Sequence, residues 1–303
     1  MLILNRKDIT ILFLLAFAWG ASFLFMRIAA PELGPVFTTE LRVTLAAAAL
    51  LLYAAVTRKK LGILRHWKKF LLLGAVNAAL PFTLICMAEL HLSASLAAIL
   101  NVTTPMFAAL AAWGTLKEKP GVSKLIGLFT GMIGVAVLVG WSPVPLEGRV
   151  LLSVIFSLGA ALCYGFGGLY AARVGQGLTP LALAAGQQLG AGIVLLPFAV
   201  IFAPQHVPSA AAVYSVLGLS LVCTSVAYLL YFHLIQSVGA VKTVSVTFLV
   251  PVFGLMWGVI FLNEPVYANT VAGLVIILLS VALINRRTRP RGRQAGSRAG
   301  QET

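Results

Sequence analysis

Two apolar segments of the chain each carry a polar residue one helical turn before a proline. Asn101 lies four residues before Pro105, and Thr247 lies four residues before Pro251. A proline inside a helix leaves the carbonyl four positions earlier without its usual donor, and in a membrane that carbonyl must be buried or face water. Thr243 shares a helical face with Thr247. The pattern predicts either binding of a polar solute or hydrogen bonds between helices, and both interpretations stay open.

Aromatic residues form a second group of candidates for solute contact. Trp19 and Phe23 are one helical turn apart on a common face. A buried tyrosine hydroxyl needs a hydrogen-bond partner, which favours tyrosines that face a cavity or another helix. The further candidates are Tyr164, Tyr228, Phe82 and Asn77. Helical phase places Phe82 and Asn77 on different faces, and packing against lipid or core is the alternative for all of these residues.

Most ionisable residues lie near the ends of apolar segments. Glu40 and Arg42 are exceptions, but a spacing of two residues turns them about 200° apart on a helix, so they cannot face one cavity. Glu118 and Glu264 follow apolar segments, and we expect each carboxylate to cap the N-terminus of the next helix. Glu89 falls in a turn between two segments. No pair of carboxylates forms an evident proton relay in this pattern.

Residues for enzymatic chemistry are scarce. The one aspartate, Asp8, precedes the first apolar segment, which excludes aspartate-based intramembrane proteases, prenyltransferases and proton pumps. No phosphate-binding loop of the G-x-x-x-x-G-K-[ST] type occurs, so ATP does not drive the protein directly. The three cysteines lie in separate segments without metal-ligand spacing. No histidine lies near the middle of a segment to serve a nucleophile as base. We therefore expect no catalytic residues, no metal and no cofactor.

Composition places these residues in a membrane protein. Of the 303 residues 60% are apolar and 10% charged, with a mean hydropathy of +0.99, whereas soluble domains are about 45–50% apolar and about 25% charged. A spanning helix needs about 20 apolar residues. Apolar segments lie near residues 9–29, 35–57, 69–90, 93–115, 121–140, 150–173, 179–202, 210–235, 238–262 and 267–285. The expected fold is an all-α integral membrane protein with ten transmembrane helices.

Lysine and arginine, 22 in total, are concentrated in alternate connections between these segments. Arg6, Lys7, the stretches 58–69 and 117–124, and the tail 286–303 lie on one side, which the positive-inside rule makes cytoplasmic. We expect both termini to be cytoplasmic and the protein to lie in the inner membrane. The tail cannot bury a core, so it is expected to be disordered and attracted to anionic lipid rather than to nucleic acid.

The sequence repeats itself across its two halves. Pro105 is matched by Pro251, and Glu118 by Glu264, at one common offset. Trp19-Gly20 is echoed by Tyr164-Gly165 at an offset one residue shorter. The predicted organisation is a five-helix repeat at 8–140, a second at 150–285 and the tail at 286–303. An odd number of spans inverts the second repeat, a plan in which secondary transporters bind substrate at the repeat interface.

The chain resembles the EamA family of the drug/metabolite transporter superfamily. The resemblance rests on Trp19-Gly20-Ala21-Ser22-Phe23, on Arg42, and on the stretch from Ser93 through Glu118 to Gly127, and it covers about residues 8–285. It implies a ten-helix exporter of two five-helix repeats around a central cavity. Within the family the chain most resembles the YddG-type amino-acid exporters, by general likeness and not by a diagnostic motif.

We therefore expect a secondary transporter that exports small metabolites, above all amino acids, by alternating access. The alternatives are another solute class, namely phosphorylated sugars, nucleotide-sugars or drugs, and outside transport an intramembrane enzyme. A channel would differ by flux without saturation or exchange. The expected partners are a small-molecule substrate and membrane lipid. We expect a monomer, with a dimer left open because Gly127, Gly131 and Gly134 allow a close helix contact within or between chains.

Proton coupling is not expected from the sequence. Without a carboxylate pair inside the spans, the pattern favours a facilitator or a loosely coupled exchanger, and the transport rate should hardly respond to loss of the pH gradient. A strict requirement for the gradient would direct attention to Glu40, inside a span, or to His233, which can titrate near neutrality.

Overall fold

The computed structural model describes residues 6–116, 122–140, 147–238, 243 and 246–284. Within these residues the regular secondary structure is helical throughout. The first half contains α1 (Arg6–Leu33), α2 (Pro35–Val56), η1 (Ile63–His66), α3 (Trp67–Gly74), η2 (Ala75–Ala79), α4 (Leu80–Ala88), α5 (Ala94–Asn101), α6 (Thr104–Leu116) and α7 (Val122–Gly140). The second half contains α8 (Gly148–Val174), α9 (Pro180–Ile201), α10 (Ala210–Leu217), η3 (Gly218–Val226), α11 (Ala227–Val238), α13 (Val246–Leu262) and α14 (Ala268–Ile284).

Seven helical stretches among the described residues are long and apolar enough to cross a membrane. They are Arg6–Leu33, Pro35–Val56, Ile63–Ala88, Ala94–Gly114, Gly148–Val174, Pro180–Ile201 and Ala210–Tyr231. Three shorter apolar helices, Leu125–Val139, Val246–Leu262 and Ala268–Ile284, fall where the other spans are predicted. The all-α membrane class is therefore confirmed, and the count of ten spans stays a prediction.

Proline positions shape the local helix geometry. Pro35 and Pro180 occupy the first turns of α2 and α9, where the missing N–H costs nothing. The break between α5 and α6 falls at residues 102–103, immediately before the turn that contains Pro105. Pro251 lies inside the continuous helix α13. The two prolines share one sequence pattern, but the helix is interrupted beside Pro105 and continuous through Pro251.

Two π-helical turns interrupt corresponding spans of the two halves. η2 separates α3 from α4, and η3 separates α10 from α11. In η2 the N–H of Leu80 bonds to the carbonyl of Ala75, five residues earlier. Such i→i+5 turns change which residues share a helix face and often mark functional sites.

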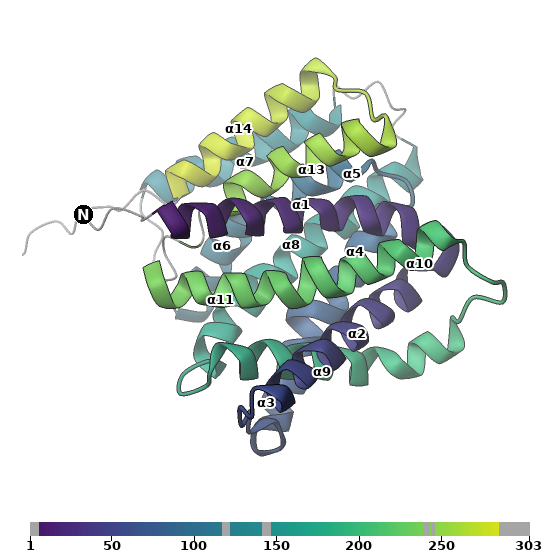
Figure 1. Cartoon of the computed structure of the whole chain (residues 1–303). Coiled ribbons are helices and arrows are strands. Elements are labelled where there is room, and N and C mark those ends of the chain that lie inside the picture. The colour runs from purple at the N-terminus through teal and green to yellow at the C-terminus, as the bar shows by residue number, and fades with distance from the viewer. Residues whose placement is uncertain (1–5, 117–121, 141–146, 239–242, 244–245, 285–303) are drawn as a thin grey trace, which may run out of the picture.

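Figure 1 shows the helices as a bundle in which α7 and α14 lie side by side at one edge, while α3 and α9 pack together at the opposite edge. The glycines of α7 face α14 of the same chain, because a Cβ at Gly127 would lie 2.9 Å from the carbonyl oxygen of Ser280. A Cβ at Gly273 of α14 would in turn lie 2.7 Å from Leu138 of α7. This close helix contact is thus made within one chain.

Equivalent glycines of the two halves make equivalent contacts. Gly20 of α1 packs against α13, where an added Cβ would come 2.6 Å from the Cβ of Phe253. Gly165 of α8 packs against α6, where an added Cβ would come 3.1 Å from the Cβ of Phe107. Each half therefore supplies one small residue that lets a helix of the other half approach closely.

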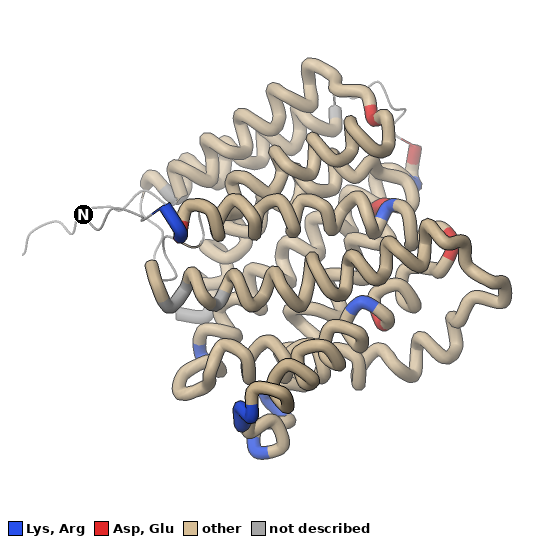
Figure 2. Tube along the Cα trace, in the orientation of Figure 1, with Lys and Arg blue, Asp and Glu red and all other residues tan. Residues whose placement is uncertain are grey.

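Charged residues divide the bundle into two ends, which Figure 2 shows on opposite sides of the view. The basic end, where α1 begins and α2 and α8 end, carries Arg6, Lys7, Arg58, Lys59, Lys60 and Arg173, together with Asp8 in the first turn of α1. The acidic end, where α1, α4 and α13 end and α8 begins, carries Glu32, Glu89, Glu147 and Glu264, together with Arg149 in the first turn of α8. The predicted basic tail 286–303 and Glu118 lie outside the described residues.

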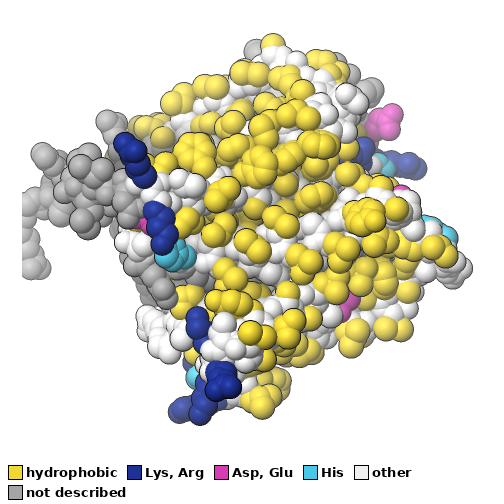
Figure 3. Space-filling view, in the orientation of Figure 1, with side chains coloured by type: hydrophobic (Ala, Val, Ile, Leu, Met, Phe, Trp, Pro, Cys, Tyr) yellow, Lys and Arg dark blue, Asp and Glu magenta, His cyan; other side chains and the backbone are white. Residues whose placement is uncertain are grey.

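The surface between the two ends is apolar. In Figure 3 hydrophobic side chains cover most of the visible face, and the lysines and arginines lie along its margin. Phe129 is 64% exposed and Leu196 55% exposed. An apolar area of this extent on a soluble monomer would be a liability, so this face is suited to contact with lipid.

Candidate binding site

A cluster of aromatic and polar side chains lies between helices of both halves. Trp19 of α1 lies against two tyrosines of α11, with ring centroids 6.2 Å from Tyr228 and 5.3 Å from Tyr231. The two tyrosine rings are themselves 6.4 Å apart in an edge-to-face arrangement. Such geometry adds to the stability of a buried aromatic contact, and it gives one wall of the cluster a fixed shape.

An amide pair continues the cluster from Tyr228. Gln187 of α9 donates from Nε2 to the hydroxyl of Tyr228 over 3.0 Å. Its Oε1 accepts from Nδ2 of Asn77 in η2 over 2.9 Å. The neighbouring Gln188 is fully buried, and neither atom of its amide has a hydrogen-bond partner among the described residues. The cluster therefore places a second buried amide beside Tyr228, next to the connected network.

Arg42 of α2 lies at the centre of the same region and is 3% exposed. Its Nε donates to Oγ1 of Thr224 in η3 over 3.0 Å, and Nη1 approaches Sδ of Met26 at 3.4 Å. The guanidinium stacks 3.6 Å above the ring of Phe82. Among the described residues it makes no ion pair, so a buried positive charge is held by neutral groups and an aromatic face.

Phe82 joins this arginine to the aromatic part of the cluster. Its ring lies 6.2 Å from that of Tyr164 on α8. Asn77 and Phe82 both contact the cluster although α-helical phase predicts different faces for them. The reason is η2, because a π-helical turn brings residues five apart toward one face.

Of the nine residues predicted to contact a solute, five therefore lie in one cluster: Trp19, Asn77, Phe82, Tyr164 and Tyr228. Phe23 is 3% exposed and packs in the apolar core. Asn101 lies at the break after α5, and its Oδ1 is buried without a hydrogen-bond partner in the described part of the chain. Thr243 is buried and Thr247 partly buried.

Sequence reasoning left Arg42, Gln187 and Gln188 out of the site. A signal was present for each, since a polar or charged side chain inside an apolar segment is a functional candidate by default. As the spacing predicts, Glu40 faces away from Arg42. Its Oε1 accepts from Thr44 over 2.6 Å, and it lies beside Gly192 of α9.

The sequence predicts that Glu264 caps the helix that follows it, and this prediction is wrong about which helix is capped. Glu264 does not cap α14, the next helix, but α5 in the other half of the chain. Its carboxylate accepts from the backbone N–H of Ala94 over 2.7 Å and of Ser95 over 3.0 Å, and from the hydroxyl of Ser95 over 2.5 Å. The tertiary approach of α13 to α5 determines this partner, which chain order cannot show.

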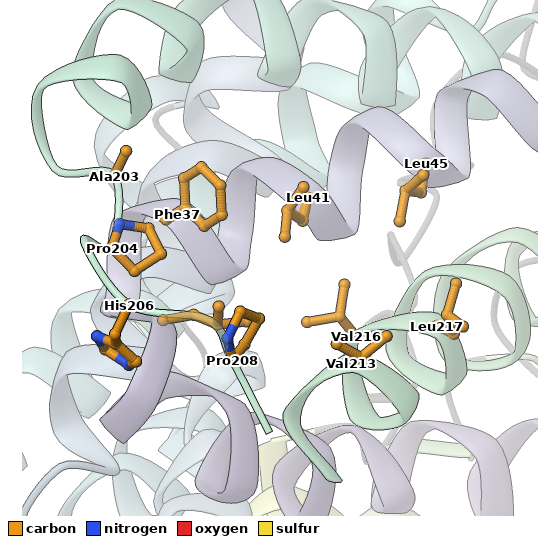
Figure 4. A pocket seen from close by; sticks show the side chains of 11 residues that line it. Phe37, Leu41, Leu45, Ala203, Pro204, His206, Pro208, Val213, Val216 and Leu217 are labelled. Atoms are coloured by element: carbon orange, nitrogen blue, oxygen red, sulfur yellow. The ribbon is translucent and has the colours of Figure 1, made fainter. Parts of the chain in front are cut away.

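A surface hollow of about 400 Å³ lies apart from the cluster, between α2, the connection after α9, and α10 (Figure 4). It is lined by Leu33, Phe37, Leu41, Leu45, Ala203, Pro204, His206, Pro208, Val213, Val216 and Leu217. None of the residues predicted to bind a solute lines it, and its wall is almost wholly apolar. It is a feature of the surface rather than part of the cluster.

The described residues also contain no group of three or more histidine, cysteine or acidic side chains that could hold a metal ion. Cys86, Cys163 and Cys223 are free thiols within separate helices. His233 is exposed.

The side chains of the cluster offer a solute aromatic surfaces for stacking, groups for hydrogen bonds and one positive charge.

Comparison with known proteins assigns this architecture to a family. The sequence model of the EamA-like transporter family matches residues 6–140 and again residues 151–286. The chain belongs to the EamA family. It is therefore a multi-pass membrane transporter of the drug/metabolite type and not an enzyme.

Individual relatives of this EamA protein match most of its length. It is 26% identical over 289 residues to the uncharacterized transporter YvbV of Bacillus subtilis (strain 168), covering 94% of this chain and 93% of that protein. It is 24% identical over 278 residues to the uncharacterized inner membrane transporter YedA of Escherichia coli (strain K12), covering 90% and 89%. A protein of known crystal structure superposes with a TM-score of 0.65 over 92% of this chain and 96% of the other, at 14% identity, which is a likeness of fold alone.

Proposed function

We propose that this EamA transporter exports a small carboxylate-bearing metabolite, an amino acid, across the inner membrane by alternating access. The observation that carries the proposal is Arg42, a buried guanidinium without an ion-pair partner in the described residues. A charge inside a membrane protein is costly and is found facing a substrate pathway or a partner. Arginine also suits planar, bidentate binding of a carboxylate.

The groups around Arg42 match the rest of an amino acid. Phe82 and Tyr164 provide aromatic surface beside the guanidinium, and Trp19 provides it on the far side of the cluster. Gln188, whose amide is buried beside Tyr228, can contribute a hydrogen bond to a polar group of the ligand. A mostly apolar site with a few placed polar groups is typical of small-molecule binding.

Phosphorylated sugars and nucleotide-sugars fit this site less well. Phosphate groups are usually bound by several cationic side chains. Within the described residues Arg42 is the one lysine or arginine that is buried. The proposal therefore assigns a single negative charge to the solute.

The proposed architecture comprises ten spans in two inverted five-helix repeats, 8–140 and 150–285. Its support is the double match of the family model, together with the equivalent contacts of Gly20 and Gly165 and the equivalent positions of η2 and η3. The cluster combines α1, α2 and α4 with α8, α9 and α11, so relative movement of the repeats would change access to it.

The proposed orientation puts the basic end of the bundle, and with it both termini, in the cytoplasm. Its support is the excess of lysine and arginine at the end where α1 begins and α2 and α8 end and the positive-inside rule. The acidic end then faces the outside of the inner membrane. Labelling single cysteines at the two ends in intact cells tests this orientation directly.

The experiment that tests the proposal is counterflow in liposomes containing the purified protein. Labelled amino acids, a nucleotide-sugar and a lipophilic cation are compared, each with and without unlabelled solute inside. We expect saturable counterflow of at least one amino acid. Flux of only the nucleotide-sugar or the cation would retain a transporter and overturn the substrate, and flux without saturation or exchange would overturn alternating access.

Asn101 and Thr247 remain proposed solute contacts at the helix positions before the paired prolines. For Asn101 the support is its buried Oδ1 without a described partner. Asn101→Ala and Thr247→Ala are expected to impair counterflow while leaving expression intact. Normal transport by both variants would restrict the site to the cluster around Arg42.

A further inference from the structure

Glu89 is a buried carboxyl group at the acidic end of the bundle. It follows the last residue of the span Ile63–Ala88, and its backbone N–H bonds to the carbonyl of Ile85 over 2.9 Å. Glu89 is 0% exposed, and neither carboxyl oxygen has a hydrogen-bond partner in the part of the chain that the structure describes. The sequence predicts a turn at this position, and a turn residue is ordinarily in contact with solvent.

Charged groups approach Glu89 from several helices. Arg27 of α1 donates from Nη1 to the backbone carbonyl of Glu89 and not to its carboxyl group. Arg42 of α2 and Glu264, which follows α13, act on it through space, and Cys86 lies one turn earlier on α4.

The remaining neighbour, α8, contributes Arg149 near its N-terminus. Arg149 lines a surface hollow together with His91, Met87 and Leu90. Arg149 and His91 are both exposed, so their charges are screened by solvent. The charged groups nearest to the buried carboxyl are thus the two arginines and one glutamate.

An ionised carboxylate in this position would be unstable. Burying a charge without a paired ion or hydrogen bond costs several kcal/mol, and such a group takes up a proton instead. Burial raises the pKa of Glu89 well above its usual range, and the negative charge of Glu264 raises it further, while Arg27 and Arg42 act in the lowering direction. Burial without hydrogen bonds to the carboxyl oxygens therefore favours the neutral carboxylic acid.

We propose that Glu89 is a proton-binding site, and that its protonation determines how well the site around Arg42 binds anionic solutes. With a proton on Glu89, Arg42 contacts only the neutral side chains of Thr224, Met26 and Phe82 among those described. Its guanidinium can then pair with a solute carboxylate. Without the proton, the negative charge of Glu89 acts through space on Arg42 and weakens the attraction of its guanidinium for a solute carboxylate. The second statement rests on the proposed function, whereas proton binding at Glu89 does not.

The two ligands then bind cooperatively, and the coupling is reciprocal. Protonation of Glu89 tightens solute binding, and solute binding raises the proton affinity of Glu89. For one coupled proton the solute affinity falls by at most about tenfold per pH unit as the pH rises through the coupled range. This inference replaces Glu40 and His233 as the residues at which a response to pH is expected.

Infrared spectroscopy of the protein in detergent tests proton binding without any solute. A protonated carboxyl group gives a carbonyl stretch that disappears on ionisation. We expect Glu89→Gln and Glu89→Leu to lose one such band that the wild type has at neutral pH. Glu40→Gln and the surface control Glu32→Gln should keep that band. Its presence in both Glu89 variants, or its loss in Glu40→Gln alone, would overturn the proposal.

Solute affinity measured against pH tests the coupling. The wild type and Glu32→Gln are expected to bind a labelled amino acid progressively more weakly as pH rises, and Glu89→Gln to bind it tightly at every pH. Tight, pH-dependent binding by Glu89→Gln would refute the coupling. Loss of the infrared band without amino-acid binding by any variant would retain the proton site and overturn the proposed substrate. Amino-acid binding together with an infrared band that is unchanged in the Glu89 variants would retain the proposed substrate and overturn the proton site.

Discussion

Replacing Arg42 with glutamine tests whether this residue anchors a solute carboxylate. An arginine side chain offers five N–H donors, and Arg42 uses Nε on Thr224 and one donor of Nη1 on Met26. The donors of Nη2 and the second donor of Nη1 are available for a ligand. Glutamine has a similar length but neither the positive charge nor the forked arrangement of donors.

The expected loss follows from the number of bonds. Hydrogen bonds to charged groups contribute about 1.5–3 kcal/mol each, so a bidentate carboxylate contact contributes about 3–6 kcal/mol. If glutamine recovers one neutral hydrogen bond of about 1 kcal/mol, the net loss is about 2–5 kcal/mol. At 1.4 kcal/mol per factor of ten, amino-acid affinity should fall by at least about 30-fold.

The fold should tolerate this change. Thr224 also donates its hydroxyl to the carbonyl of Leu219 over 2.7 Å, so it keeps a partner. Removing a buried charge as a whole avoids the cost of leaving an unpaired partner behind. Phe82 loses a cation–π contact of about 0.5–2 kcal/mol. The thermal midpoint of Arg42→Gln should therefore change little.

The assay is equilibrium binding and counterflow of a labelled amino acid, with the thermal midpoint measured on the same preparation. Arg149→Gln is the matched control, because it removes the same charge from an exposed position at the acidic end. Wild-type affinity in Arg42→Gln, with the fold intact, would refute the role of Arg42. Arg42→Lys, which keeps the charge but not the bidentate geometry, should give an intermediate loss.

Three further predictions concern stability, each measured by thermal unfolding in detergent. Gly20→Ala and Gly165→Ala should each destabilise the protein by about 1–3 kcal/mol through overpacking. At the control position Gly168 an added Cβ meets no atom within 4 Å, so Gly168→Ala should stabilise its helix by about 0.5–1 kcal/mol. Equal thermal midpoints for all three variants would contradict the packing described. Glu264→Gln should cost about 1–2 kcal/mol because it weakens the cap of α5, and no loss would mean that the cap is not made in solution. The pKa of Glu89 is raised in the folded protein, so its contribution to stability is fully present below the ordinary glutamate pKa and is lost as pH rises through the raised value. Glu89→Gln should remove this dependence of stability on pH. A pH profile of the variant equal to that of the wild type would contradict the raised pKa of Glu89.

Local sequence features were sufficient for the class of protein and for much of its secondary structure. Composition alone identifies a membrane protein, because apolar side chains in such excess cannot be covered by so few charges. Pro105 predicts a carbonyl without its usual helical donor at Asn101, where α5 ends, since the constraint that proline imposes acts within one helical turn. The spacing of Glu40 and Arg42 predicts their opposite directions for the same reason, because helix geometry fixes both positions locally.

Only the tertiary structure determined which side chains meet. Glu264 caps α5 and Glu89 is buried among groups from α1 and α2, and both facts depend on helices that are distant in sequence. The contact of both Asn77 and Phe82 with the cluster depends on η2, where i→i+5 bonding replaces the α-helical period on which sequence reasoning relies. Periodicity reports the faces of an isolated regular helix, whereas a shared site depends on irregular turns and on which helices pack together.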